Sequence, residues 1–379
     1  MTRLDRRAFL AGAALGTASV ALGRSAHGLL PVPLRETKRI LLVSFSGGVR
    51  SRETFGTPAN VPNLMRLAAE GVAYPRTRVS NLGHFGATLS IFTGISEARG
   101  IRDNTRGTDP TLFEYLRKDL GLSSGDVWLS TSGGAQESNI SYSLHPDFGA
   151  RYGANSVDGD GIFNTEFKGI LDAYGRPREM PAEEAALLER MRGSIGGHER
   201  GNAEEAQTAA RIERFLLDEL KRGTQDLNGI GASDAKALKV ARNLMAVFRP
   251  RFLSVVLRDA DVAHSSFNNY VQVIRRNDQM LGELLDALRR DRELAESTSI
   301  VVVPEFGRDA DLNSRRGLDH GDGSDDFKYV TMVCAGPDIR RGEVVNEEVR
   351  TIDVCPTVCE LLGAEARYAR GSRLPRLLA

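Results

Sequence analysis

The chain has 379 residues, 41% of them hydrophobic and 26% charged, and it is long enough to bury a large core. Lysine and arginine together number 50, as do aspartate and glutamate, so the formal net charge is zero. This balance lacks the basic footprint of a nucleic-acid-binding protein, and we expect no nucleic-acid partner. Cys334, Cys355 and Cys359 lie in apolar contexts, which predicts buried thiols rather than a disulfide framework.

The N-terminus begins like an export signal. Arg6 and Arg7 precede Phe9 and Leu10, and an uncharged, Ala- and Gly-rich stretch follows. This pattern resembles the twin-arginine (Tat) signature, which is an address read by a receptor. The apolar run is shorter than the roughly 20 residues that a spanning helix needs, which favours a signal over a permanent anchor. We therefore predict a Tat signal peptide over residues 1–26.

The Tat signature has a consequence for location. Tat substrates cross the membrane already folded, so the prediction places the protein in the periplasm or outside the cell, with the Tat translocase as its partner during export. A small-x-small sequence at Ser19–Ala21 is a candidate cleavage point, and retention as an anchor stays open. The remaining residues, 27–379, are predicted to form one α/β domain.

Strand-like and helical segments alternate after the signal. Arg39–Phe45 is apolar and ends at Ser46-Gly47-Gly48, which is typical of a buried parallel strand followed by a glycine loop. Helical spacing over Val61–Glu70 ends at Gly71. Further strands are predicted at 126–131, 252–257, 298–303 and 329–334, and further helices at 111–118, 270–289 and 354–362. The alternation predicts an α/β fold, with a mostly parallel sheet sandwiched by helices.

The composition changes between about residues 146 and 249. A Gly- and Asp-rich stretch at Asp158–Gly161 leads into charged segments with amphipathic spacing at 183–192, 203–221 and 235–247. Because the strand pattern resumes afterwards, we predict a helical insertion rather than a separate domain. Substrate specificity or contacts with a protein partner are expected to reside there.

The C-terminal part of the chain resembles a known family. Tyr329–Glu343 reads as a strand with a Gly-Pro loop, and Thr351–Gly363 contains Asp-x-x-Pro-Thr and ends in Leu-Leu-Gly. The opening strand, Pro62–Leu64 and Thr88–Gly94 match the same family in order. Together these segments are similar to the alkaline phosphatase and sulfatase superfamily. The Tat signal and a Glu-Phe-Gly-Arg motif at residues 305–308 resemble a divergent, sulfatase-like branch of it.

The resemblance implies an alkaline phosphatase-like fold and hydrolysis of phosphate or sulfate esters at one or two divalent metal ions, zinc, manganese or calcium. It implies that Asp261, His264 and His320 ligate one ion, with Asp261 preferred over Asp259. The spacing between Asp261 and His264 is shorter than in the family pattern. One carboxylate and two imidazoles leave an open coordination position, as in catalytic zinc sites. A small anionic ester is the substrate class that this site implies.

A second metal site is incomplete in this sequence. Ser46-Gly47-Gly48 stands where the family has an Asp, and Phe306 stands where it has a His. Glu305 remains as a candidate ligand or catalytic residue. His84 falls at the family's nucleophile position, where an imidazole can ligate a metal or accept a phosphoryl group. Thr88 is the nearest hydroxyl, although its position also suits a helix residue packed below the site.

Arginines complete the candidate catalytic set of His84, Glu305 and Arg308. Arg308 can close a structural ion pair with Glu305 or bind an anion bidentately. Arg50 and Arg52 can face an anionic substrate or simply be solvated.

Two functions from different classes therefore stay open. One is an exported metal-dependent ester hydrolase, and the other is a non-catalytic binding or assembly module that kept the fold but lost ligands. Transfer of a phosphoryl group is a third option. Convergence of Asp261, His264 and His320 on one point distinguishes the first from the second, because metal ligands lie roughly 2 Å from their ion.

Overall fold

The structure is a computed structural model that describes residues 35–81, 83–96, 105–133, 139–158 and 227–379, with scattered positions between 207 and 219. These residues belong to one unit, Arg35–Ala379. The predicted signal peptide and the predicted helix at 183–192 lie outside the described residues, and the predicted helix at 203–221 is described only in part. Within the described ranges, every helix is too short or too polar to cross a bilayer.

A nine-stranded sheet organises the described part of the chain. Its strands are β1 (Arg39–Phe45), β2 (Val72–Arg78), β3 (Val127–Thr131), β4 (Asn155–Asp158), β5 (Phe252–Leu257), β6 (Thr298–Pro304), β7 (Tyr329–Ala335), β8 (Glu343–Val344) and β9 (Val349–Arg350). The order is β4-β3-β5-β1-β6-β7-β2-β8, with β9 also paired to β2. The strands from β4 to β6 are parallel to one another, whereas β7 runs antiparallel to both β6 and β2.

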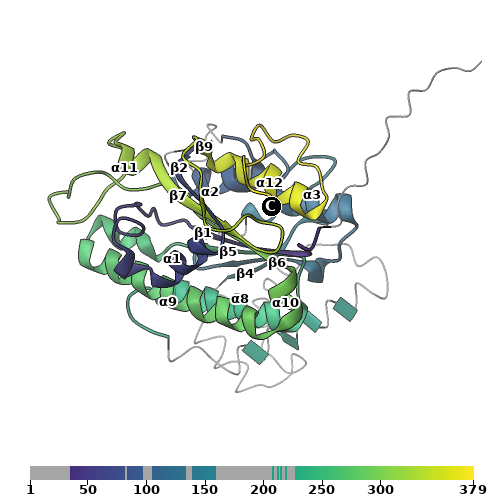
Figure 1. Cartoon of the computed structure of the whole chain (residues 1–379). Helices are drawn as coiled ribbons and strands as arrows, with labels where there is room; N and C mark the ends of the chain where they lie inside the picture. Colours follow the sequence, from purple (N-terminus) through teal and green to yellow (C-terminus); the bar gives the residue numbers. More distant parts are fainter. Residues whose placement is uncertain are drawn as a thin grey trace, which may run out of the picture. The chain divides into compact units, whose positions relative to one another are not determined.

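Helices cover both faces of this sheet (Figure 1). On one face lie α2 (His84–Thr93), α3 (Leu112–Leu120) and α12 (Val354–Leu362). On the other lie α1 (Pro62–Ala69), α8 (Ala232–Phe248), α9 (Phe267–Arg290) and α10 (Arg292–Ser297). Short elements complete the fold: α11 (Asp325–Lys328) and 3₁₀ turns that include η7 (Asp259–His264), directly after β5.

Strand β1 shows why the sheet is buried on both sides. Leu41 and Val43 pack into the core that α8 and α9 share. Ile40 and Leu42 pack into the opposite core, with α2, α3 and α12. Successive strand side chains point to opposite faces, so a strand covered on both faces is apolar throughout. The same double cover fixes the register of β1 and thereby the position of the loop that follows it.

The predicted fold class is confirmed, and the predicted strands and helices outside the 146–249 range coincide with observed elements to within three residues at each end. Four sheet strands were not predicted, and two of these, β8 and β9, are only two residues long. Strand β4 lies within 146–249, the range predicted as a helical insertion, and pairs with β3. Strand β2 contains Pro75, and its register with β7 shifts between Tyr74 and Thr77. A proline cannot donate to a sheet ladder, so the sequence of β2 does not look like a strand.

The structure also places the three cysteines and the two arginines, Arg50 and Arg52, that were considered in the sequence. The three cysteines are buried and unpaired, as predicted. Arg50 is neither solvated nor free to meet a substrate, because it is 3% exposed and its Nη2 lies 2.6 Å from Glu53 Oε1. Arg52, by contrast, is half exposed and contacts the Asp326 carboxylate.

Candidate functional site

The candidate site lies where three neighbouring parallel strands end. β1 leads into the Ser46–Gly48 loop, β5 into η7, and β6 into Glu305–Arg308. The carboxyl ends of parallel strands meet at one edge of a sheet, and open α/β folds place their ligand sites there. Segments more than 200 residues apart in sequence are therefore adjacent in space.

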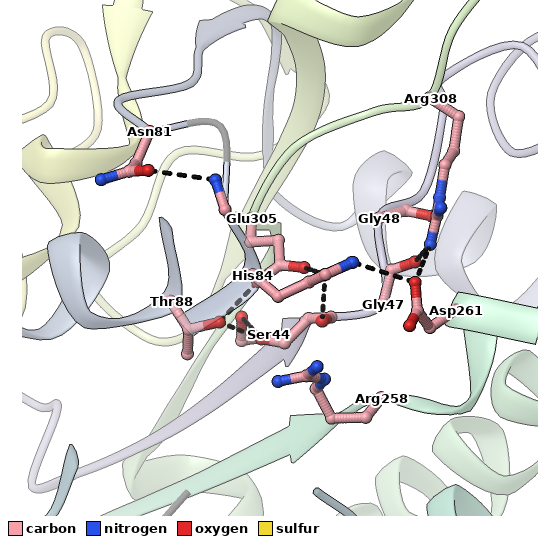
Figure 2. A network of polar contacts seen from close by, with 12 residues as sticks. Ser44, Gly47, Gly48, Asn81, His84, Thr88, Arg258, Asp261, Glu305 and Arg308 are labelled. Atoms are coloured by element: carbon pink, nitrogen blue, oxygen red, sulfur yellow. Dashed lines mark hydrogen bonds and ion pairs between the residues drawn. The ribbon is translucent and has the colours of Figure 1, made fainter. Parts of the chain in front are cut away.

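His84 is the first residue of α2 and the centre of the polar network drawn in Figure 2. Its Nδ1 lies 2.5 Å from Glu305 Oε1 and 3.2 Å from the Ser46 carbonyl oxygen. Its Nε2 lies 2.9 Å from Asp261 Oδ1, but without hydrogen-bond alignment, so it is a buried ring nitrogen with no hydrogen-bond partner. The imidazole thus spans two carboxylates, one buried and one half exposed.

Glu305 contacts Nδ1 of His84 on the side that faces the protein core. Its side chain is fully buried, and its second oxygen, Oε2, accepts a 2.6 Å hydrogen bond from Thr88 Oγ1. Thr88 Oγ1 also lies 2.9 Å from Ser46 Oγ. Both oxygens of Glu305 are therefore engaged with protein groups, whereas the sequence suggested Glu305 as a metal ligand. Thr88 packs beneath His84, the second of the two positions considered for it.

η7 brings the Asp261 and His264 side chains together on one side of the site. Asp261 Oδ1 lies 3.3 Å from His264 Nε2, and His264 Nδ1 lies 2.7 Å from Asp319 Oδ1. The loop that carries Asp319 is tied to η7, since the Leu318 amide donates to the Ala263 carbonyl. Asp259, the alternative ligand, points elsewhere, and its carboxylate accepts from the amide of Asp234 in α8.

His320 completes a cluster of possible metal ligands. Its ring centroid lies 4.8 Å from that of His84 and 5.0 Å from those of His264 and Phe306. One ligand atom from each of His84, Asp261, His264 and His320 can be chosen so that all four lie within 4.8 Å of one another. Phe306 forms a wall of the site, since it is fully buried and packs against His84. The three residues that the resemblance implied as ligands thus converge, and His84 joins them.

Arg308 enters the cluster from the loop after β6, and its side chain is fully buried. Its Nη2 lies 2.6 Å from Asp261 Oδ1, and its Nη1 lies 3.1 Å from His264 Nε2. The remaining donors reach the carbonyls of Gly47, Gly48 and Leu318. All five guanidinium N–H groups are therefore used. Of the two roles considered for Arg308, the ion pair is observed, but with Asp261 rather than Glu305.

These contacts shift the protonation of His84 and Asp261. Burial alone would lower the pKa of His84, but the charge of Glu305 and the contact with Asp261 outweigh it and raise that pKa to about 9. Burial would raise the pKa of Asp261, but His84 and Arg308 together hold it well below its ordinary value. In the metal-free protein the imidazolium of His84 therefore faces an ionised Asp261 at neutral pH.

For Glu305 and His320, in contrast, burial determines the direction of the pKa shift. Complete burial raises the pKa of Glu305, and the neighbouring His84 only partly offsets this. Burial, and then the positive charges of His84 and Arg308, lower the pKa of His320 to about 4. His320 is consequently neutral at pH 7 and keeps a lone pair available for a Lewis acid.

Sequence reasoning missed three residues that shape this site. Asp319 orients His264, and the adjacency of Asp319 to His320 was the available signal. Ser46 connects the β1 loop to Thr88, and Arg258 directly follows β5. Figure 2 places the Arg258 side chain on the side of His84 near Ser44, and its charge acts on the Glu305 carboxylate. Only its position at a strand end could have indicated it.

Comparison with known proteins relates the chain to one family model and to several structures. Residues 182–354 match the family described as "Protein of unknown function (DUF1501)". Comparison with curated proteins gives no match. A crystal structure of a variant of the alkaline phosphatase PafA gives a TM-score of 0.59 at 10% identity, covering 92% of this chain and 100% of that chain. The fold is alkaline phosphatase-like.

A second structure supports the same conclusion. The lipoteichoic acid synthase LtaP from Listeria monocytogenes gives a TM-score of 0.53 at 12% identity, covering 86% of this chain and 72% of that chain. Identities this low establish the fold alone. Within this alkaline phosphatase-like fold, the chemistry must be argued from the residues at the carboxyl edge of the sheet.

Proposed function

We propose that this chain is an exported, divalent-metal-dependent hydrolase of phosphate or sulfate esters. The observation that carries the proposal is the convergence of His84, Asp261, His264 and His320 at the carboxyl edge of an alkaline phosphatase-like sheet. Three imidazoles and a carboxylate are donors that suit zinc. Asp261 and His264 are each more than 30% exposed at the side chain, so a solute can reach them.

The residues present fit one metal ion on two observations. The Nε2 atom of His84 is buried beside Asp261 Oδ1 without an aligned hydrogen bond, and an ion shared by the two atoms would give it a partner. Asp261 Oδ1 lies 2.9 Å from His84 Nε2 and 3.3 Å from His264 Nε2. Ligands of a tetrahedral zinc ion lie roughly 3.3 Å apart, given metal–ligand distances near 2 Å.

The chain's own residues divide the remaining tasks. Glu305 on Nδ1 of His84 and Asp319 on Nδ1 of His264 hold those two rings so that Nε2 faces the cluster. Phe306 limits the approach of water from one side. A divalent ion, when bound, supplies Lewis acidity and positive charge for an ester that gains negative charge in its transition state.

We propose water as the nucleophile. The hydroxyls of Ser46 and Thr88 are fully buried beneath His84 and are hydrogen-bonded to one another, and each has a second partner, Ser44 for Ser46 and Glu305 for Thr88. Neither can reach an ester at the exposed side of the cluster without leaving these partners. The resemblance implies that His84 occupies the family's nucleophile position, but its Nε2 faces the other donors, which favours ligation over phosphoryl acceptance.

Export by the Tat pathway is part of the proposal. It rests on Arg6 and Arg7 and the apolar stretch after them. A cluster assembled from residues as distant as His84 and His320 exists only in a folded chain, so a route that exports folded proteins allows the metal to be loaded beforehand. Fractionation of cells with and without a working Tat translocase tests this, and a cytoplasmic protein in both strains would contradict it.

Metal content and ester hydrolysis test the enzymatic proposal together. The purified protein should hold close to one divalent ion and hydrolyse at least one member of a panel of aryl phosphates, phosphodiesters and sulfates. His84→Ala and His320→Ala should lose both properties. His145→Ala is the matched control, because His145 packs against Phe148 and Tyr368 outside the cluster. Absence of both metal and hydrolysis would instead support a non-catalytic binding protein.

A further inference from the structure

The buried guanidinium of Arg308 is bound in the way that a metal ion is bound. Its acceptors are three backbone carbonyls, the Oδ1 atom of Asp261 and the ring nitrogen of His264. They come from three separate segments: the loop after β1, η7 with its carboxylate and imidazole, and the loop before His320. A cation suits such a set of acceptors because it includes a carboxylate and no donor, and arginine keeps its charge at any physiological pH.

We infer that Arg308 is the resident cation of the site, and that it occupies on Asp261 and His264 the donor positions that an added divalent ion would otherwise use. The inference rests on the proposed metal site but not on ester hydrolysis. It deepens the proposal by setting the capacity of the site at one ion and by making Arg308 a competitor of that ion.

Both ring nitrogens of His264 already have hydrogen-bond partners. Guanidinium has no acceptor, so Arg308 Nη1 donates to His264 Nε2, and the ring hydrogen is on Nδ1, which donates to Asp319. The single lone pair of Nε2 is therefore in use. An ion at the cluster must displace Arg308 from His264, or use His84, His320 and the second oxygen of Asp261.

The buried charge of Arg308 also supports its role as a competitor of the ion. Arg308 is fully buried beside the Asp261 carboxylate, and a buried charge requires a partner. Removing the guanidinium would leave Asp261 and the His264 lone pair facing an empty cationic position. A small divalent ion would then meet donors that no longer have a competitor.

Zinc affinity of the Arg308→Ala variant tests the inference. Wild-type protein and variant are freed of metal and titrated with zinc by calorimetry at one pH. We expect the variant to bind zinc about tenfold more tightly or better, since Asp261 and His264 have lost the cation that competes for them. Guanidinium ion at a non-denaturing concentration should fill the position, raise the melting temperature of the variant and weaken its zinc binding. Zinc affinity that is unchanged or weaker in the variant, with no response to guanidinium, would overturn the inference.

A second variant covers the case in which Arg308→Ala does not fold. Arg308→Lys keeps the positive charge, but an ammonium group cannot span Asp261 and His264 as the planar fork does. We expect Arg308→Lys to bind zinc more tightly than wild type, and weaker binding would contradict the inference. Added guanidinium ion should leave the zinc affinity of the wild-type protein unchanged, because Arg308 already fills the position. If affinity rises in both variants while no protein hydrolyses any ester, the inference stands and the proposed function fails. If neither wild type nor variants bind zinc, both fail.

Discussion

The two edges of the central sheet differ in what the fold places there. At the carboxyl edge, side chains from α2, η7 and the loops after β6 converge on one point. At the amino edge, a cavity of about 520 Å³ lies between the ends of α1, α9 and α10, with Leu67, Leu285 and Leu288 in its lining. This cavity thus lies away from the polar cluster.

The charged groups at the two edges show why the cluster matters more than the hollow. Beside the cavity, Arg289 pairs with Glu70 and Asp286, and all three side chains are between 35% and 47% exposed. In the cluster, Arg308 and Glu305 are fully buried. Water screens the first group and not the second, and burial together with neighbouring charges shifts the pKa values of His84 and His320 in the cluster. Cavity volume alone does not identify a reactive site.

The largest expected difference between the two edges is the loss of zinc affinity when Glu305 is substituted. In Glu305→Gln a neutral amide replaces the carboxylate that orients His84 through Nδ1. We expect zinc affinity to fall by about 10- to 100-fold, the usual cost of removing such an orienting group. Calorimetric titration of the metal-free protein measures it. Glu296→Gln, at the rim of the amino-edge cavity, is the matched control and should bind zinc like wild type. Equal affinity in both variants would remove Glu305 from the site.

An intermediate effect concerns pH and His84, which faces Glu305, Asp261 and His320. Its pKa is raised from 6.5 to about 9, so the folded state holds this proton more tightly than the unfolded state does. The resulting stability is complete below pH 6.5 and is lost as pH rises through 9, at up to about 1.4 kcal/mol per pH unit.

Urea unfolding of metal-free protein at several pH values between 6.5 and 9 measures this slope. His84→Gln has no titrating imidazole and should show a flatter profile over the same range. Parallel profiles for the two proteins would show that His84 is not held as an imidazolium between Glu305 and Asp261.

The smallest expected effect is at the amino edge. Arg289→Ala removes two half-exposed ion pairs, and such pairs contribute about 0–1 kcal/mol each. Urea unfolding should therefore change little, while zinc binding and ester hydrolysis stay at wild-type levels. A clear loss of either activity would assign a function to the cavity and break the contrast between the two edges.

Much of the fold follows from local patterns. The ranges Phe252–Leu257 and Val354–Leu362 are observed with the predicted bounds because a fully buried parallel strand and an amphipathic helix each have a continuous signal. Strand β4, Asn-Ser-Val-Asp, is too short and polar to carry one. Strand β2 is held by pairing to β7 on one side and to β8 and β9 on the other, partners that no local window contains.

The candidate site was predictable in part. Asp261, His264 and His320 could be named because the resemblance implies metal ligands at their positions, after β5 and before β7, and the structure brings them together. The contacts of Arg308 could not be anticipated. They depend on the backbone carbonyls of Gly47, Gly48 and Leu318, which carry no sequence signal. The residue type predicts a partner, but only the fold selects Asp261 over the neighbouring Glu305.

The glycine loop after β1 links two features of this sequence, the missing carboxylate at Ser46–Gly48 and the buried Arg308. A Cβ atom on Gly47 would lie 2.6 Å from the Arg258 carbonyl oxygen. Gly48 has a φ of +68°, and a Cβ there would lie 2.8 Å from Arg308 Nε. A carboxylate grafted onto either position would collide with the backbone or the arginine. Redesign toward a two-metal centre must therefore rebuild this loop, and a side chain at position 48 also requires that Arg308 be replaced.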